Sequence, residues 1–176
     1  MPFGAFLRSD KMEKKISNHA AAAKMIRQYM KANGFVGRVN AEAYSMGSSV
    51  RVYVQDLPPA RAKELEDYAG QFEYGHFDGM IDLYEYSNVR EDIPQVKYVF
   101  VNNEISAEMR QKIWNFVKVY FNGLEGAPEN AEDAGNYYVP NFNMYGNQLI
   151  YQAFKGGYMN DYFWNFVNGV AEQEAA

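Results

Sequence analysis

The stretch YSMGSSVRVYV, residues 44–54, contains a turn followed by a strand with two different faces. Gly47 favours the positive φ that a tight hairpin turn usually requires. After the turn, Val50, Val52 and Val54 alternate with polar or aromatic residues, which is the period-2 pattern of a half-buried strand. The stretch therefore predicts a β-hairpin whose valines face the core.

Helical patterns lie on both sides of this hairpin. A first helix is expected over about residues 18–33, because good helix formers end at Gly34, a natural residue for a helix C-terminus. The two strands of the hairpin are expected over about 36–44 and 49–55. The pair Pro58-Pro59 then ends the second strand and begins a second helix.

Two more strands and a third helix are expected further along the chain. Residues 79–88 and 95–103 have strand composition, and the acidic segment VREDIP between them is interpreted as a hairpin loop. Ser106 is expected to cap the third helix. The order α-β-β-α-β-β-α predicts an α+β fold with a four-stranded, mainly antiparallel sheet over residues 18–123.

The remaining segments differ from this unit in composition. Residues 1–17 are interpreted as a loose N-terminal extension, and residues 124–136 as an acidic, flexible loop. The tail, residues 137–176, is rich in aromatic and amide side chains, with short helices expected near 148–155 and 161–167. Because about 40 residues rarely form a stable core alone, we expect the tail to dock on the first unit or on another chain, including a second copy.

The composition of the 176 residues excludes several classes of site. The chain has no cysteine, which rules out disulfides, thiolate catalysis and cysteine-based metal sites. It lacks the common nucleotide-binding and metal-binding motifs, so neither a cofactor nor a metal is predicted. No apolar run reaches the roughly 20 residues that span a bilayer, and a cytoplasmic protein without a membrane partner is expected.

Catalysis has one weak candidate site. His76 and Asp78 are two residues apart in the segment GHFDG, and such a pair can serve as acid and base or bind a metal. A loop histidine beside a turn-forming Asp-Gly is much more common. The other histidine, His19, has no catalytic context, and the chain is therefore expected not to be an enzyme.

Strand alternation predicts a polar and aromatic sheet face opposite the valines, to which the strand over 95–103 would contribute Lys97. Tyrosines with interleaved polar groups are typical of the platforms on which sheet-based proteins stack the bases of single strands. The face is not clearly basic, however, and a wet face, a face covered by the tail and a protein-binding face stay open as alternatives. The candidate binding residues on this face are Tyr44, Arg51, Tyr53, Tyr84 and Tyr86.

An acidic segment extends from residue 73 to residue 92. Its carboxylates are either ordinary solvated charges or a surface that imitates the phosphates of DNA toward a partner. The candidate residues for such contacts are Glu73, Asp78, Asp82, Glu85, Glu91 and Asp92.

Four stretches carry a resemblance to a known family: AAAKMIRQYMKANGF (21–35), YSMGSSVRVYVQDLPP (44–59), FDGMIDLYEY (77–86) and KYVFVNNEIS (97–106). With them, residues from about 20 to 123 resemble the large polyvalent protein-associated domain of subtype 29. The resemblance implies a module of phages and conjugative elements that acts in a bacterial host. It brings no catalytic residues to transfer.

Two functions are therefore expected from the sequence. The leading hypothesis is a non-catalytic protein that binds and inhibits a host defence complex, such as a CRISPR effector or a restriction enzyme, with the acidic segment as a candidate DNA-mimicking surface. In that case, charge reversal at Asp78, Asp82 and Glu85 should weaken binding to the target. The alternative is an accessory protein that binds single-stranded nucleic acid with the tyrosine-rich face and the basic first helix.

Overall fold

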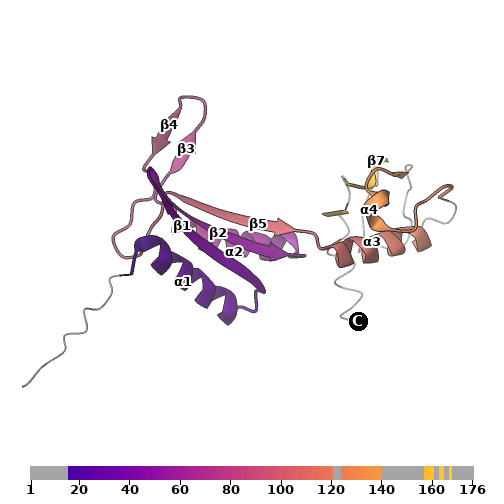
Figure 1. The fold of residues 1–176 in the computed structure, drawn as a ribbon, viewed down its shortest axis with the longest axis horizontal. Coiled ribbons are helices and arrows are strands. Elements are labelled where there is room, and N and C mark those ends of the chain that lie inside the picture. Colours follow the sequence, from indigo (N-terminus) through magenta and orange to yellow (C-terminus); the bar gives the residue numbers. More distant parts are fainter. Residues whose placement is uncertain (1–15, 121–123, 140–156, 161–162, 165–166, 168–176) are drawn as a thin grey trace, which may run out of the picture.

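The computed structural model describes residues 16–120, 124–139, 157–160, 163–164 and 167 (Figure 1). They form a mixed α+β fold, as the sequence predicted. The elements are, in chain order, α1 (Asn18–Ala32), β1 (Gly37–Tyr44), β2 (Gly47–Gln55), α2 (Pro59–Gly70), β3 (His76–Asp78), β4 (Leu83–Glu85), β5 (Tyr98–Glu104), α3 (Ala107–Tyr120), α4 (Ala131–Ala134), β6 (Tyr138–Val139) and β7 (Gly157–Tyr158).

The hairpin of β1 and β2 forms where the opening stretch predicted it. Tyr44 pairs with Gly47, which leaves two residues in the turn, and Gly47 has a φ of +156°. Val50, Val52 and Val54 are buried. Before the hairpin, Gly34 has a φ of +71°, in agreement with its predicted place just after the first helix.

The main sheet has the strand order β1-β2-β5. β1 and β2 are antiparallel, whereas β2 and β5 are parallel, with Val52 opposite Val101. The parallel pairing follows from α2, which carries the chain back along the sheet before β5 begins and so makes a β-α-β crossover. Side chains of α1 and α2, among them Ile26 and Leu65, share one core with the β2 valines, so both helices cover the same face of the sheet.

The predicted four-stranded antiparallel sheet is wrong in two respects. The segment 79–88 contributes only β4, which pairs with β3 in a separate two-stranded hairpin that projects beyond the sheet (Figure 1). The strand over 95–103 is present as β5, but it pairs in parallel with β2. The apolar residues at the hairpin turn do not provide a buried face: Met80 is 95% exposed and Ile81 is 60% exposed.

The helix α3 begins as predicted but packs elsewhere. The hydroxyl of Ser106 accepts a hydrogen bond from the Met109 backbone N–H at 3.0 Å, which is the geometry of an N-cap. The sequence placed this helix with the sheet. Its buried residues, Trp114 among them, instead form a second core with α4 and with Phe163 of the tail. In Figure 1 this second unit lies beyond the end of β5.

The segment 124–136, expected to be a flexible loop, contains the short helix α4. The Asn130 side chain caps α4 by accepting a hydrogen bond from the Asp133 N–H, and Ala131 and Ala134 are buried against α3. The predicted extension at 1–17 and the helix predicted at 148–155 lie almost or wholly outside the described residues, and the helix at 161–167 lies there in part. Among the described residues, no helix is long and apolar enough to cross a membrane.

Candidate functional site

The sheet has an open face on the side opposite the core that it shares with the two helices. Alternation along the strands decides which side chains reach it, since the residues next to each buried valine point the other way. The open face consists of Arg38, Asn40, Glu42 and Tyr44 from β1, Ser49, Arg51, Tyr53 and Gln55 from β2, and Tyr98, Phe100, Asn102 and Glu104 from β5.

Strand register places an arginine beside an aromatic ring twice on this face. Arg38 is opposite Tyr53, and its guanidinium carbon lies 4.4 Å from the centre of that ring. Arg51 is opposite Phe100, with a distance of 4.7 Å between the guanidinium carbon and the ring centre. Both distances are in the range of cation–π pairs, so each of these rings has a positive charge beside it.

An aromatic row continues from the sheet toward the β3–β4 hairpin. Neighbouring ring centres are 6.0 Å apart for Phe100 and Tyr98, 5.6 Å for Tyr98 and Tyr84, and 5.7 Å for Tyr84 and Tyr74. Tyr86 stacks on Tyr74 with a ring-centre distance of 5.6 Å. These spacings are those of favourable aromatic pairs, so the five rings form one contiguous surface.

Hydrogen bonds fix the middle of the aromatic row. The Tyr84 hydroxyl donates to the Lys97 carbonyl oxygen at 2.6 Å. Burial, followed by the negative charge of Glu73 and the neighbouring tyrosines, raises the pKa of the Tyr84 hydroxyl. It therefore stays protonated at physiological pH and remains a donor. The Lys97 ammonium lies 5.1 Å from the Tyr84 ring centre and 5.4 Å from the Tyr98 ring centre, which adds a third cation beside the rings.

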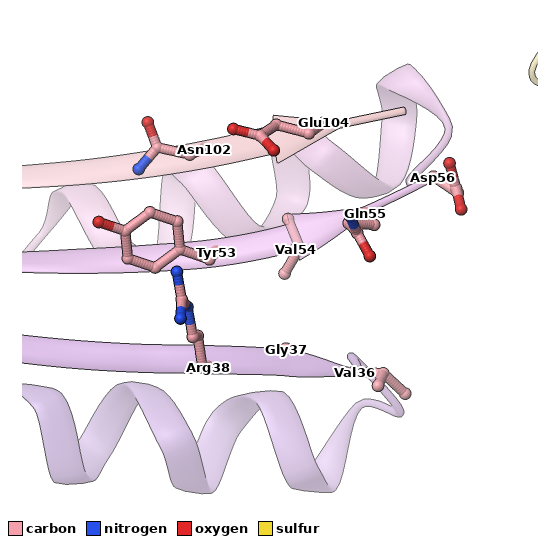
Figure 2. A pocket seen from close by; sticks show the side chains of 9 residues that line it. All are labelled: Val36, Gly37, Arg38, Tyr53, Val54, Gln55, Asp56, Asn102 and Glu104. Carbon is pink, nitrogen blue, oxygen red and sulfur yellow. The ribbon is translucent and has the colours of Figure 1, made fainter. Parts of the chain in front are cut away.

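A groove of about 570 Å³ lies at the end of the open face where β2 and β5 finish (Figure 2). The Tyr53 ring and the Arg38 guanidinium lie next to one another on β2 and β1, and Asn102 and Glu104 follow one another along β5. The carboxylate of Glu104 makes no hydrogen bond or ion pair with any residue that the structure describes. The other lining residues are Val36, Gly37, Val54, Gln55 and Asp56.

The sequence-predicted aromatic residues lie on the open face or in the aromatic row, although some belong to other elements than predicted. Arg51 and Tyr53 lie on the open face, as strand alternation predicted. Tyr84 and Tyr86 were assigned to a strand of the main sheet, but they reach the aromatic row from the separate β3–β4 hairpin. Tyr44, at the end of β1, lies on the same side of the sheet as Arg38, as predicted, and is exposed.

Sequence reasoning missed Tyr98, Phe100 and Tyr74. It assigned Lys97 to the polar face of the fourth strand, which would turn Tyr98 and Phe100 toward the core. The valines of KYVFVNN contain the correct signal, because Val99 and Val101 alternate with the two aromatic residues and pack toward the buried face. If the valines of this strand had been assigned to the core, as they were in β2, Tyr98 and Phe100 would have been predicted on the open face.

The six acidic candidates have different surroundings. The Glu73 carboxylate accepts a hydrogen bond from the Val99 N–H at 3.0 Å, and Asp92 pairs with Arg90. Asp78 accepts a hydrogen bond from the Met80 N–H at 2.8 Å in the turn of the β3–β4 hairpin. The remaining three, Asp82, Glu85 and Glu91, are exposed. Inhibition of a host defence complex through these residues stays a prediction.

His76 does not pair with Asp78. Its Nδ1 lies 3.0 Å from the Ser87 hydroxyl, and its Nε2 lies 3.5 Å from a Glu85 carboxylate oxygen, at an exposed position on the β3–β4 hairpin. Within the described part of the chain, no group of three or more histidine or carboxylate side chains is arranged to hold a metal ion.

The open face presents flat rings, two planar cations and hydrogen-bonding groups in one layer. Rings and guanidinium planes stack on nucleobases of any sequence, while arginine and lysine attract phosphates. The charged residues of the face, counted with Lys97, are three cations and two carboxylates, Glu42 and Glu104. The cations lie beside the rings, whereas Glu42 lies on the edge strand β1 and Glu104 at the end of β5. The local charge is thus favourable where bases would stack.

One of the three comparisons with known proteins gave a match. The family described as large polyvalent protein associated domain 29 matches residues 17–111, a segment that contains α1, α2, the whole main sheet and the β3–β4 hairpin. No curated protein and no solved structure matches the chain.

Proposed function

The chain belongs to the large polyvalent protein associated domain 29 family, and we propose that it binds single-stranded nucleic acid across the open face of its sheet. The observation that carries the proposal is the register of β1, β2 and β5, which alternates arginines and aromatic rings on the side that the helices leave uncovered. The mobile-element setting that the family resemblance implies is compatible with such a ligand.

Base stacking supplies most of the binding in this proposal. Phe100 is 39% exposed, and together with Tyr98 and Tyr53 it offers ring surface to successive bases. Each base stacked on an aromatic side chain contributes about 1–3 kcal/mol. Stacking depends little on sequence, so the face accepts a single strand of mixed composition.

Phosphate contacts contribute a smaller part. With Arg38, Arg51 and Lys97 as the cations, a single strand would release about three counterions, which corresponds to a slope of about −2 for log K against log salt concentration. A duplex is disfavoured, because its bases are stacked on one another and cannot lie flat on the rings.

The experiment measures fluorescence anisotropy of a labelled twelve-residue oligothymidine, as DNA and as oligouridine RNA, at 50 and 200 mM salt. We expect wild-type affinity to fall about sixteenfold over this fourfold change in salt. Phe100→Ala should weaken binding about tenfold through loss of one stacking surface. Arg51→Ala should reduce the magnitude of the salt slope by about 0.7.

Phe77→Ala is the matched control, because Phe77 is also an exposed aromatic residue but lies on β3, outside the open face and the aromatic row. This variant should keep wild-type affinity. Absence of binding by the wild type, or equal losses in Phe100→Ala and Phe77→Ala, would overturn the proposal.

A further inference from the structure

We propose that the groove at the end of the open face selects guanine, with Glu104 and Asn102 reading the Watson–Crick edge of one base. This inference rests on the proposed function and adds a base preference at one position of the strand. It concerns the groove of about 570 Å³ where β2 and β5 end.

The floor of the groove is suited to a flat base. The Arg38 guanidinium carbon lies 4.4 Å from the centre of the Tyr53 ring, so a cation and an aromatic ring adjoin in the groove. A base that lies against them gains contact with both the π system and the cation. The volume of the groove is in the range of pockets that hold small ligands.

The wall of the groove supplies a short pattern of donors and acceptors. Asn102 and Glu104 are two residues apart on β5, so their side chains point to the same face about 7 Å apart along the strand. Asn102 carries an amide that can donate, and the only hydrogen bond of its side chain among the described residues is a long one, 3.4 Å from Nδ2 to the Val52 carbonyl oxygen. Glu104 carries two oxygens that only accept when ionised.

Guanine complements this pattern better than the other bases. Its Watson–Crick edge has, in order, the O6 acceptor, the N1–H donor and the N2 amino donor. The two adjacent donors form a fork like that of a guanidinium group, which a carboxylate binds with both oxygens. Adenine and cytosine each present one amino donor next to a ring acceptor, and thymine or uracil presents one N–H between two acceptors. With those bases one Glu104 oxygen would face an acceptor or remain unpaired.

Glu104 is also the available carboxylate in the groove. The Asp56 carboxylate accepts a hydrogen bond from the Ser106 N–H at 2.8 Å, next to the start of α3. Asp56 has a φ of +59°, and its own N–H donates to the Glu104 carbonyl oxygen at 2.9 Å. Asp56 therefore holds the end of β5 in place, whereas the Glu104 side chain points into the groove (Figure 2).

The test compares labelled oligothymidines of twelve residues that carry one central guanine, inosine or adenine. Inosine keeps O6 and N1–H of guanine but lacks the N2 amino group. We expect wild-type protein to bind the guanine strand about tenfold more tightly than the inosine strand, since a good bidentate pair contributes about 1–3 kcal/mol of discrimination. Glu104→Gln should remove this difference between the guanine and inosine strands.

Glu42→Gln is the matched control, because it removes the same charge from the same face outside the groove. It should keep the guanine preference. If oligothymidine binds but guanine and inosine bind equally, or if Glu104→Gln retains the preference, the guanine inference is wrong and nucleic-acid binding stands. If no oligonucleotide binds, the proposed function fails, and the base preference fails with it.

Discussion

Glu73 shows how one residue links the β3–β4 region to the edge of the sheet. Its carboxylate accepts a hydrogen bond from the Val99 N–H on the free side of β5, and its charge acts on Tyr84 in the aromatic row. Burial raises the pKa of Glu73 above its ordinary value of 4.5, against smaller lowering effects of the Val99 N–H and of His76. The ionised form is therefore less favourable in the fold than in the unfolded chain.

This pKa shift predicts a pH-dependent effect of Glu73→Gln. A raised pKa in the folded state stabilises the fold at low pH, and this contribution is lost as the pH rises through the folded-state pKa. Glutamine keeps an oxygen for the Val99 N–H and carries no charge. We therefore expect Glu73→Gln to increase the free energy of unfolding at pH 7 relative to wild type, with a smaller gain at pH 4, in urea denaturation followed by circular dichroism.

Glu73→Ala provides the comparison, because it removes the hydrogen bond as well as the charge. The loss of the Val99 partner should cost about 1 kcal/mol and oppose the gain from removing the charge. A difference between Glu73→Gln and wild type that is equal at the two pH values would contradict the burial argument.

At the scale of elements, the pairing of β1 with β2 depends on a close approach at Gly37. A Cβ built there would lie 2.3 Å from the Tyr53 carbonyl oxygen and 2.9 Å from Cγ1 of Val54. The first contact is with backbone, which cannot move without breaking the hairpin register. Glycine at this position therefore permits the register that places Arg38 over the Tyr53 ring.

Gly37→Ala should destabilise the protein by about 1–3 kcal/mol, the usual cost of forcing extra volume into a packed site. Gly70→Ala is the matched control: Gly70 ends α2, and a Cβ there meets nothing within 4 Å. Because alanine is the better helix former, this control should be neutral or stabilising by up to about 1 kcal/mol. Thermal unfolding distinguishes the two variants. Equal changes in the midpoint temperature would show that the contact between the added Cβ and the Tyr53 carbonyl oxygen has no cost in stability.

At the scale of the whole molecule, the described residues form two cores with no buried residue in common. One lies between the main sheet and the helices α1 and α2, and the other joins α3, α4 and residues of the tail. A hydrogen bond from the Ser106 N–H to Asp56 ties the start of α3 to the end of β2. Since packing energy is local to each core, the two units should respond separately to core mutations.

The two tryptophans make this separation measurable, because Trp114 and Trp164 both belong to the second unit and the chain has no others. Leu65→Ala should destabilise the first core by about 2–5 kcal/mol, which lowers the midpoint of the far-ultraviolet transition and leaves the tryptophan fluorescence transition in place. Phe163→Ala should lower the midpoint of the tryptophan fluorescence transition and leave the far-ultraviolet transition in place. A shift of both signals by the same amount in either variant would show that the units unfold together.

Local patterns were sufficient for the elements that depend on neighbouring residues. The β1–β2 hairpin, the end of α1 at Gly34, the start of α2 at the prolines and the Ser106 cap were all predicted and are present. Each depends on turn chemistry, capping or alternation within a few residues, which the chain sets without long-range contacts. Three of the four stretches that carry the family resemblance contain these features.

Other features depend on partners distant in sequence, and only the tertiary structure decided them. The strand over 95–103 pairs in parallel with β2 because α2 returns the chain to the same end of the sheet, and β3 and β4 pair with each other. The same pairing turned Tyr98 and Phe100 to the open face, next to Arg51. The sequence by itself determined the valine face and the existence of a polar, aromatic face opposite it. The arrangement of the polar, aromatic face is a row of rings beside arginines, with a groove at Glu104. This arrangement depends on the register between strands that are distant in sequence, which no local pattern encodes.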